Sequence, residues 1–216
     1  MKIVALISGR GSNLQAMIQA AAEGLPIEIA AVISNNPEAL GLQLAKRAGI
    51  PTHILPHTHY PSREIFDQAM IEIIDPYAPE WIVLAGFMRQ LSEVFVKHYP
   101  RRILNIHPSL LPLYPGLNTH KRALENQEKI HGASIHLVDL GLDTGPILAQ
   151  AQVPIEAGET SLSLAEKVLK LENQMYPQLL GWLATGELMV SGTEIRFADQ
   201  ELPAKGIQIS FSIDPK

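Results

Sequence analysis

Residues 2–24, KIVALISGRGSNLQAMIQAAAEG, decide the class of fold. The β-branched apolar run KIVALI leads into the glycine-containing loop SGRGS, and apolar residues at helical spacing follow in NLQAMIQAAAEG. A strand, a tight loop and a helix in this order form the first half of a βαβ unit. The segment therefore predicts a parallel sheet covered by helices.

The same alternation of strand-like and helical patterns continues along the chain. Further strand-like runs occupy 27–34, 52–55, 81–86, 101–107, 132–140 and 147–155. Helical patterns occupy 38–49, 62–75, 92–99, a short segment around 120–126 and a long one over about 161–184. Gly24 and Gly49 stand where helices should stop, and Ser12 and Ser62 where they could be capped. We expect an open, mostly parallel, twisted α/β sheet of Rossmann-like type, with helices on both faces and ligands outside the carboxyl ends of the strands.

The tail after Gly186 predicts a short hairpin in ELMVSGTEIRF, and its last residues are expected to fray. The domain boundaries that we expect are 1–186 for a catalytic domain and 187–216 for the hairpin and tail.

Composition excludes several classes of function. The net charge of −5 and the lack of a Lys/Arg run argue against a nucleic-acid or membrane-surface binder. The chain has no cysteine, which excludes thiolate catalysis and cysteine-based zinc sites and fits a reducing cytoplasm. No apolar stretch approaches the roughly 18 residues that span a bilayer, and the first residues do not resemble a signal peptide. We expect a cytoplasmic protein with small-molecule partners.

The loop SGRGSNL offers backbone amides at the start of a helix, an arrangement that binds anions. A dinucleotide is disfavoured because Leu14 replaces the third glycine of GxGxxG, and because the strand over 27–34 ends without an acidic residue. A single phosphate held by Gly11, Ser12 and Asn13 fits better. The alternative is an ordinary strand-to-helix turn with a serine or asparagine cap.

Asn105 and His107 lie two residues apart in RRILNIH, so a strand presents both on one face, roughly 7 Å apart. Pro108 ends that strand where a sheet of this type has its crevice. An amide and a protonated imidazole can both donate to a developing oxyanion, which suits acyl-type transfer. The alternative is a buried pair satisfied by loop backbone.

Asp143, in the loop LGLDTGP, could reach the same crevice, where a carboxylate would raise the pKa of an imidazole. The alternative is an aspartate that forms the turn before Thr144 and Gly145. No GxSxG or SxxK motif occurs, so transfer should be direct, without a covalent enzyme intermediate. The remaining histidines show no metal-binding spacing, and His57 and His59 favour a plain loop between prolines.

Five segments together resemble one family, the phosphoribosylglycinamide (GAR) formyltransferases of purine biosynthesis. The segments are SGRGSNLQAMI, VLAGFMRQLS, LNIHPSLLPLYPGLNTH, HGASIHLVDLGLDTGPILAQ and LENQMYP, within residues 3–177. The resemblance implies formyl transfer from 10-formyltetrahydrofolate to the glycinamide amine, with no metal. It also implies small-molecule substrates only, no nucleic acid or membrane, and a monomer or weak homodimer.

The resemblance assigns a role to each matching residue. Catalysis would fall to Asn105, His107 and Asp143, with Asp143 keeping His107 charged. The N-terminal half would bind GAR and the C-terminal half the folate. GAR would be held by Gly11, Ser12, Asn13 and Glu172. The folate would be held by Arg63, Met88, Arg89, Gln90, Leu91, Asn105, Asp139, Leu140, Gly141, Leu142 and Asp143.

Plainer roles are possible for the outer members of this set. Arg63 could be a solvated partner of Glu64, Glu172 could face solvent, and Met88 could sit in the core. The sequence departs from the family pattern at Gln90, in the implied pterin wall, and at Leu169, one turn before Glu172.

Three rival functions follow from the same residues. A formyltetrahydrofolate hydrolase and a methionyl-tRNA formyltransferase would share the catalytic three, but we expect each to carry an additional domain. A non-catalytic nucleotide-binding module would explain the glycine loop, yet it leaves Asn105, His107 and Asp143 without a role.

Overall fold

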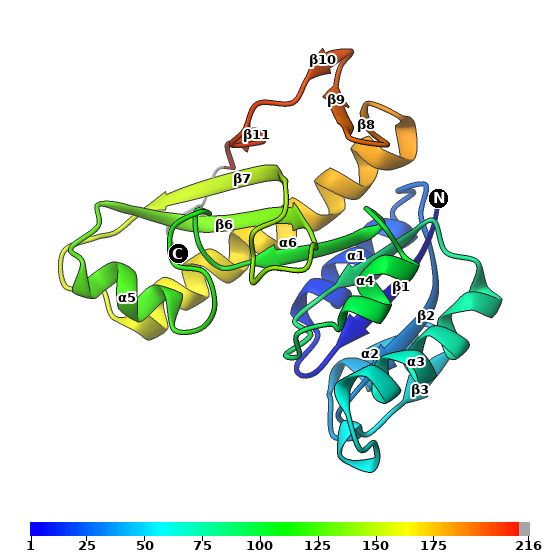
Figure 1. Ribbon diagram of the computed structural model, residues 1–216. Coiled ribbons are helices and arrows are strands. Elements are labelled where there is room, and N and C mark those ends of the chain that lie inside the picture. Colours follow the sequence, from blue (N-terminus) through cyan, green and yellow to red (C-terminus); the bar gives the residue numbers. More distant parts are fainter. Residues whose placement is uncertain (212–216) are drawn as a thin grey trace. The chain divides into compact units, whose positions relative to one another are not determined.

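The structure is a computed structural model, and it describes residues 1–211 (Figure 1). The chain divides into two units, residues 1–105 and 106–216. The fraying predicted for the last residues concerns 212–216, which lie outside the described range.

The first unit alternates strands and helices. Its elements are β1 Lys2–Ile7, α1 Ser12–Ala22, β2 Glu28–Ser34, α2 Gly41–Arg47, β3 Thr52–Ile54, the 3₁₀ turn η1 His57–His59, α3 Arg63–Ile74, the 3₁₀ turn η2 Asp75–Tyr77, β4 Trp81–Leu84, α4 Glu93–His98 and the start of β5 Ile103–His107. The strands pair in the order β5-β4-β1-β2-β3, and every pair is parallel. Chain order reverses beside β1, the position where open α/β sheets bind ligands.

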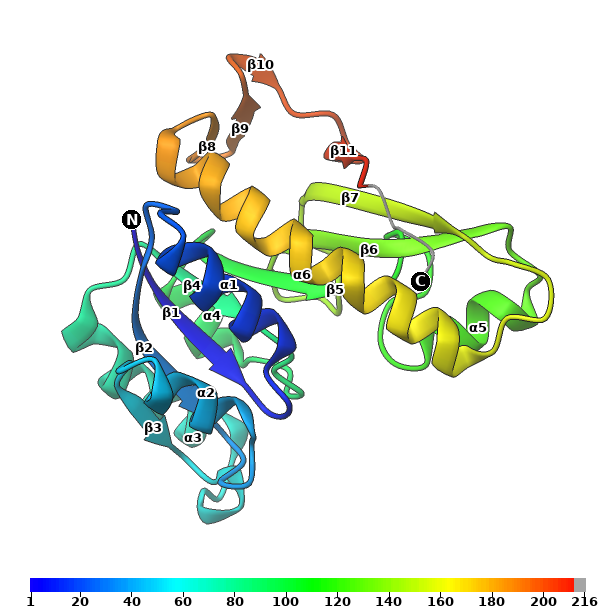
Figure 2. The same cartoon turned by 180° about the vertical axis from the view of Figure 1, so that it is seen from behind.

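The strands of the first unit are continuously apolar because helices cover the sheet on both faces. Residues 3–7 of β1 are almost fully excluded from solvent. Helix α1 packs with α2, and α3 packs with α4. Opposite views show these two pairs on opposite faces of the sheet (Figures 1 and 2). Because both faces of such a strand are buried, apolar and polar residues do not alternate along it, which explains the unbroken apolar run in KIVALI.

Local signals place most helix ends. The Ser62 hydroxyl accepts the Ile65 N–H and caps α3, as predicted. Gly24 and Gly49 follow α1 and α2 with positive φ. The prediction for Ser12 is wrong: it is the first residue of α1, and Gly11, with φ of 81°, occupies the cap position without a side-chain hydrogen bond.

The second unit is built on an antiparallel pair of strands. Its further elements are α5 Thr119–Glu125, β6 Ile130–Leu137, β7 Ile147–Pro154, α6 Ser161–Thr185, β8 Leu188–Ser191, β9 Glu194–Phe197, β10 Gln200–Glu201 and β11 Ile207–Ile209. Helix α6 packs on β6 and β7, and α5 packs on α6 (Figure 2). The predicted hairpin is β8 and β9. Strand β10 extends that hairpin and β11 pairs in parallel with β7, and neither strand was predicted.

The fold class predicted from the sequence is confirmed as a mostly parallel sheet with helices and a small C-terminal hairpin. Among the described helices, none combines the length and the apolar character that a membrane span requires.

Candidate active site

The glycine loop of the first unit is tied to the loop after β4. The Ser8 N–H donates to the Gly86 carbonyl at 3.1 Å, and the Met88 N–H donates to the Ser8 hydroxyl oxygen at 2.8 Å. That hydroxyl in turn donates to Asn35 Oδ1 at 2.6 Å. Strands β1 and β4 are neighbours at the point where the strand order reverses. The loops that follow their carboxyl ends therefore meet where a ligand is expected.

Gly11 is a position that only glycine fits. Its φ is +81°, and a β-carbon there would lie 2.7 Å from the α-carbon of Gly41. The first amides of α1 follow it directly, and Asn13 is buried there. The loop is therefore a tight turn and an amide-rich helix start, but the serine or asparagine cap that the alternative named does not form, because Gly11 occupies the cap position.

Helix α3 supports the loop after β4, which carries four of the residues predicted to bind folate. The Arg63 guanidinium lies 3.8 Å from Glu64, the partner that the plainer alternative names, and also 3.5 Å from Gln90 Oε1 of the predicted folate set. Arg89 lies over the Phe66 ring at 5.2 Å, and Leu91 is buried.

Met88 is 74% exposed, so the alternative that it belongs to the core is wrong. The buried Asp67 carboxylate accepts the Ser92 N–H at the start of α4. Burial raises the pKa of Asp67. This hydrogen bond fixes the backbone directly after the Met88–Leu91 stretch.

Glu172 does not face solvent. Only 9% of it is exposed on α6, so that alternative is wrong. One turn further, Tyr176 is fully buried and hydrogen-bonds the Ile106 backbone. Burial, followed by the nearby Glu172 charge, raises the pKa of Tyr176. Helix α6 thus holds β5 at the residue between Asn105 and His107.

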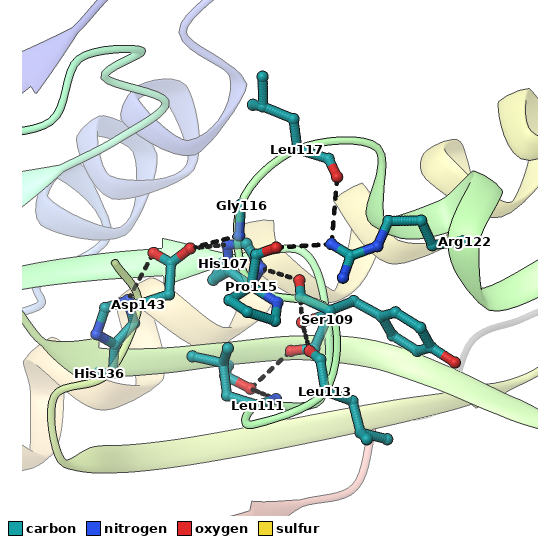
Figure 3. Close-up of polar contacts among 12 residues, drawn as sticks. His107, Ser109, Leu111, Leu113, Pro115, Gly116, Leu117, Arg122, His136 and Asp143 are labelled. Carbon is teal, nitrogen blue, oxygen red and sulfur yellow. Dashed lines mark hydrogen bonds and ion pairs between the residues drawn. The ribbon is translucent and has the colours of Figure 1, made fainter. Parts of the chain in front are cut away.

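His107 is held from both sides of its ring (Figure 3). Nε2 lies 2.8 Å from the Tyr114 carbonyl oxygen, so this nitrogen carries a proton and donates it. Nδ1 faces Asp143 Oδ2 at 3.4 Å, and the residue is 5% exposed. The structure therefore brings His107 and Asp143 together. Asn105, two residues earlier in β5, is partly exposed.

Asp143 connects two imidazoles. Its backbone has φ of 54°, and its Oδ2 also accepts the Gly116 N–H at 2.9 Å. Its Oδ1 lies 3.6 Å from Nε2 of His136, whose Nδ1 donates to the Leu137 carbonyl. The turn-forming role proposed as the alternative for Asp143 belongs instead to Asp139, which accepts hydrogen bonds from the Gly141 N–H and the Thr144 hydroxyl.

The sequence reasoning missed His136, which it grouped with the histidines of no assigned role. A signal was present, because Ser134 and His136 lie two residues apart in the otherwise apolar segment 133–137 of that strand. Leu140 and Leu142, which lie within the turn between Asp139 and Thr144, have about half of their surface exposed.

Electrostatics at the two central groups is set by burial and by their contact. Burial lowers the pKa of His107 below its ordinary value, although the Tyr114 carbonyl and the Asp143 carboxylate both act to raise it. Asp143 therefore acts on the pKa of His107 in the predicted direction, while the loss of hydration acts in the opposite direction and is the larger effect. Burial by itself raises the pKa of Asp143, yet the nearby His136 ring, the hydrogen bond from the Gly116 N–H and the nearby His107 ring leave it lowered.

This arrangement is suited to proton movement and to stabilising negative charge. A buried imidazole with one N–H fixed on a carbonyl and its other nitrogen facing a carboxylate can gain and lose one proton without reorienting. Within residues 1–211, no group of three or more His, Asp or Glu side chains is placed to hold a metal ion.

Comparison with known proteins gives a consistent result. The formyl transferase family matches residues 1–180. The phosphoribosylglycinamide formyltransferase of Escherichia coli K12 is 48% identical over 207 residues, which cover 95% of this chain and 98% of that protein. The human trifunctional purine biosynthetic protein adenosine-3 is 40% identical over 190 residues, which cover 88% of this chain and 19% of that protein.

Solved structures agree with the sequence relatives. The structure of phosphoribosylglycinamide formyltransferase from Coxiella burnetii in complex with CHES superposes with a TM-score of 0.93 at 48% identity, covering 97% of this chain and 99% of that one. A glycinamide ribonucleotide transformylase from Symbiobacterium toebii gives a TM-score of 0.88 at 41% identity, covering 92% and 94%.

Proposed function

The chain belongs to the formyl transferase family and, within it, to the phosphoribosylglycinamide formyltransferases, and from that membership we propose the reaction that it catalyses. The formyl group of 10-formyltetrahydrofolate is transferred to the amine of glycinamide ribonucleotide. The products are formylglycinamide ribonucleotide and tetrahydrofolate.

The observation that carries this proposal is the buried His107, held between the Tyr114 carbonyl and the Asp143 carboxylate. The amine attacks the formyl carbon, and negative charge develops on the formyl oxygen. Asn105 donates its amide to that oxygen, and His107 in its protonated form donates beside it. Collapse breaks the bond between carbon and the folate nitrogen, which takes up the proton that the amine loses. Asp143 stabilises the imidazolium while that proton moves.

The remaining predicted residues are proposed as binding groups. Gly11, Ser12 and Asn13 offer amides and short polar side chains to the phosphate, and the buried Glu172 offers a carboxylate to the ribose or amine.

The residues proposed to hold the folate suit its chemistry. Exposed apolar side chains at Met88, Leu140 and Leu142 can contact an aromatic ring system. The Arg63 guanidinium can pair with a carboxylate. The rest of that proposed set is Arg89, Gln90, Leu91, Asn105, Asp139, Gly141 and Asp143.

A spectrophotometric assay tests the reaction. The protein is mixed with 10-formyltetrahydrofolate, and deformylation is followed with and without glycinamide ribonucleotide. We expect turnover only when the ribonucleotide is present, and His107→Ala should lower kcat by roughly 100-fold or more. Turnover without the ribonucleotide would indicate the hydrolase instead, and no turnover in either mixture would indicate a binding module.

We also propose a cytoplasmic location and a monomeric or weakly dimeric state. The absence of cysteine supports the first, since such a chain needs no oxidising compartment. Sedimentation velocity across a range of protein concentrations tests the second. We further propose that residues 1–186 form the catalytic domain.

A further inference from the structure

A buried polar pair lies beneath the loop that follows His107. Ser134 on β6 and Gln150 on β7 are directly opposite each other in the antiparallel ladder. Their side chains are joined, since Gln150 Nε2 donates to the Ser134 hydroxyl at 2.9 Å. Ser134 is fully buried and Gln150 is 4% exposed. Burying two polar side chains costs desolvation energy unless their hydrogen-bonding groups are satisfied. The partners of these two side chains therefore show what the pair does.

The explanation lies in the loop backbone. The Ser134 hydroxyl donates to the Ser109 carbonyl at 2.7 Å and accepts the Leu111 N–H at 3.0 Å. Gln150 Nε2 donates to the Leu111 carbonyl at 2.8 Å. The Ser134 hydroxyl thereby uses its one proton and both lone pairs, and the loop backbone at Ser109 and Leu111 is fixed to the rigid strands.

The fixed loop carries the acceptor of His107. The Ser109 hydroxyl donates to the Leu113 carbonyl at 2.6 Å and lies 3.4 Å from the Tyr114 carbonyl oxygen. That same Tyr114 oxygen accepts the hydrogen bond from His107 Nε2–H, with 2.8 Å between the two heavy atoms. A continuous chain of polar contacts therefore runs from Ser109 and Leu111 to the imidazole (Figure 3).

We propose that Gln150 and Ser134 are positioning residues for His107. By fixing residues 109–114 they fix the Tyr114 carbonyl, and that carbonyl decides which ring nitrogen of His107 carries the proton. The opposite nitrogen is then the one that faces Asp143. The expected effect on turnover rests on the proposed function. The expected effect on the protonation of the His107 ring does not, because it can be measured directly.

The experiment compares Gln150→Leu with the wild-type enzyme. Leucine has a similar volume and removes both donated hydrogen bonds. We expect kcat to fall by about tenfold to 100-fold, since displacements near 1 Å at a reacting group have that effect, while the KM values of both substrates stay within about twofold. In ¹⁵N-histidine NMR spectra recorded where His107 is neutral, the wild-type ring should be protonated at Nε2. The Gln150→Leu ring should show a mixture of both tautomers.

Controls separate positioning from general loss of stability. Gln152→Leu, at an exposed glutamine two residues further along β7, should leave kcat and the His107 nitrogen shifts unchanged. Ser134→Ala removes the hydroxyl that binds Ser109, Leu111 and Gln150, with little loss of volume. This variant replaces Gln150→Leu if the latter does not fold, and it should show the same fall in kcat and the same mixture of His107 tautomers. Kinetics are normalised to the folded fraction measured by thermal unfolding.

The proposal is overturned if the folded variants keep kcat within about twofold of wild type, or if kcat falls while the His107 nitrogens stay unchanged. Failure of the wild-type enzyme to transfer formyl groups would refute the proposed function instead. The NMR comparison would still decide whether Gln150 and Ser134 control the His107 ring.

Discussion

Acidification should destabilise this protein chiefly through a buried histidine, His131 on β6. The residue is 1% exposed, and its Nε2 lies 3.1 Å from Nδ1 of His120. Burial, followed by the neighbouring His120, lowers the pKa of His131 from 6.5 to about 4. Between those values the unfolded chain binds a proton that the folded chain does not, so the free energy of unfolding falls as the pH falls.

The magnitude follows from those two pKa values. Between pH 7 and pH 5, proton uptake by the unfolded state at His131 lowers the free energy of unfolding by about 2 kcal/mol. Burial also lowers the pKa of His120 and His107, so both act in the same direction. Asp67 acts in the opposite direction, because burial raises its pKa and the folded state is then the better proton binder.

Urea unfolding at pH 7 and pH 5 measures this effect. His131→Gln keeps a polar side chain but takes up no proton, so about 2 kcal/mol of the pH dependence should disappear. His59→Gln, at an exposed histidine in η1, serves as the matched control and should keep the wild-type pH dependence. If His131→Gln and wild type lose the same free energy between the two pH values, the argument from burial is refuted.

Three further predictions concern the glycine loop, the carboxylate and a helix cap. Gly11→Ala should cost about 1 kcal/mol or more of stability and raise the KM for glycinamide ribonucleotide, because its β-carbon has no room. Gly9→Ala, with open space around it, should be neutral in the same unfolding and kinetic assays. Asp143→Asn should lower kcat by roughly 100-fold and move the pKa of His107 further down in an NMR titration, because the carboxylate raises it. An unchanged His107 pKa would contradict that coupling. Ser62→Ala should cost about 1 kcal/mol in urea unfolding, and no change would mean that its cap hydrogen bond contributes nothing.

Local pattern predicted most of the fold because each signal lies within a few residues of what it specifies. Apolar runs and helical spacing placed the long strands and helices, and Ser62 and Gly49 marked ends that the structure confirms. The cap at Ser12 failed because the φ of +81° at Gly11 depends on the close approach of the α2 backbone. Strand β11 is three residues long and exists only through pairing with β7, more than fifty positions earlier.

The candidate site divides in the same way. Asn105 and His107 could be placed together because strand periodicity is a local property. Asp143 was placed beside them mainly by the family resemblance and His136 was not predicted, because Asp143 and His136 reach each other only through loop closure. The sequence also suggested that Asp143 raises the pKa of His107, and the burial that acts against this effect is a property of the packed structure.

The sequence by itself determined the α/β class, the strand that carries Asn105 and His107, and the family to which the chain belongs. Tertiary structure alone decided that His136 shares Asp143 with His107, that Asp139 forms the turn, and which carbonyl accepts the hydrogen bond from His107. The physical reason is range: backbone periodicity and steric preference act between near neighbours. Hydrogen bonds and desolvation depend on groups that only folding brings within a few ångströms of one another.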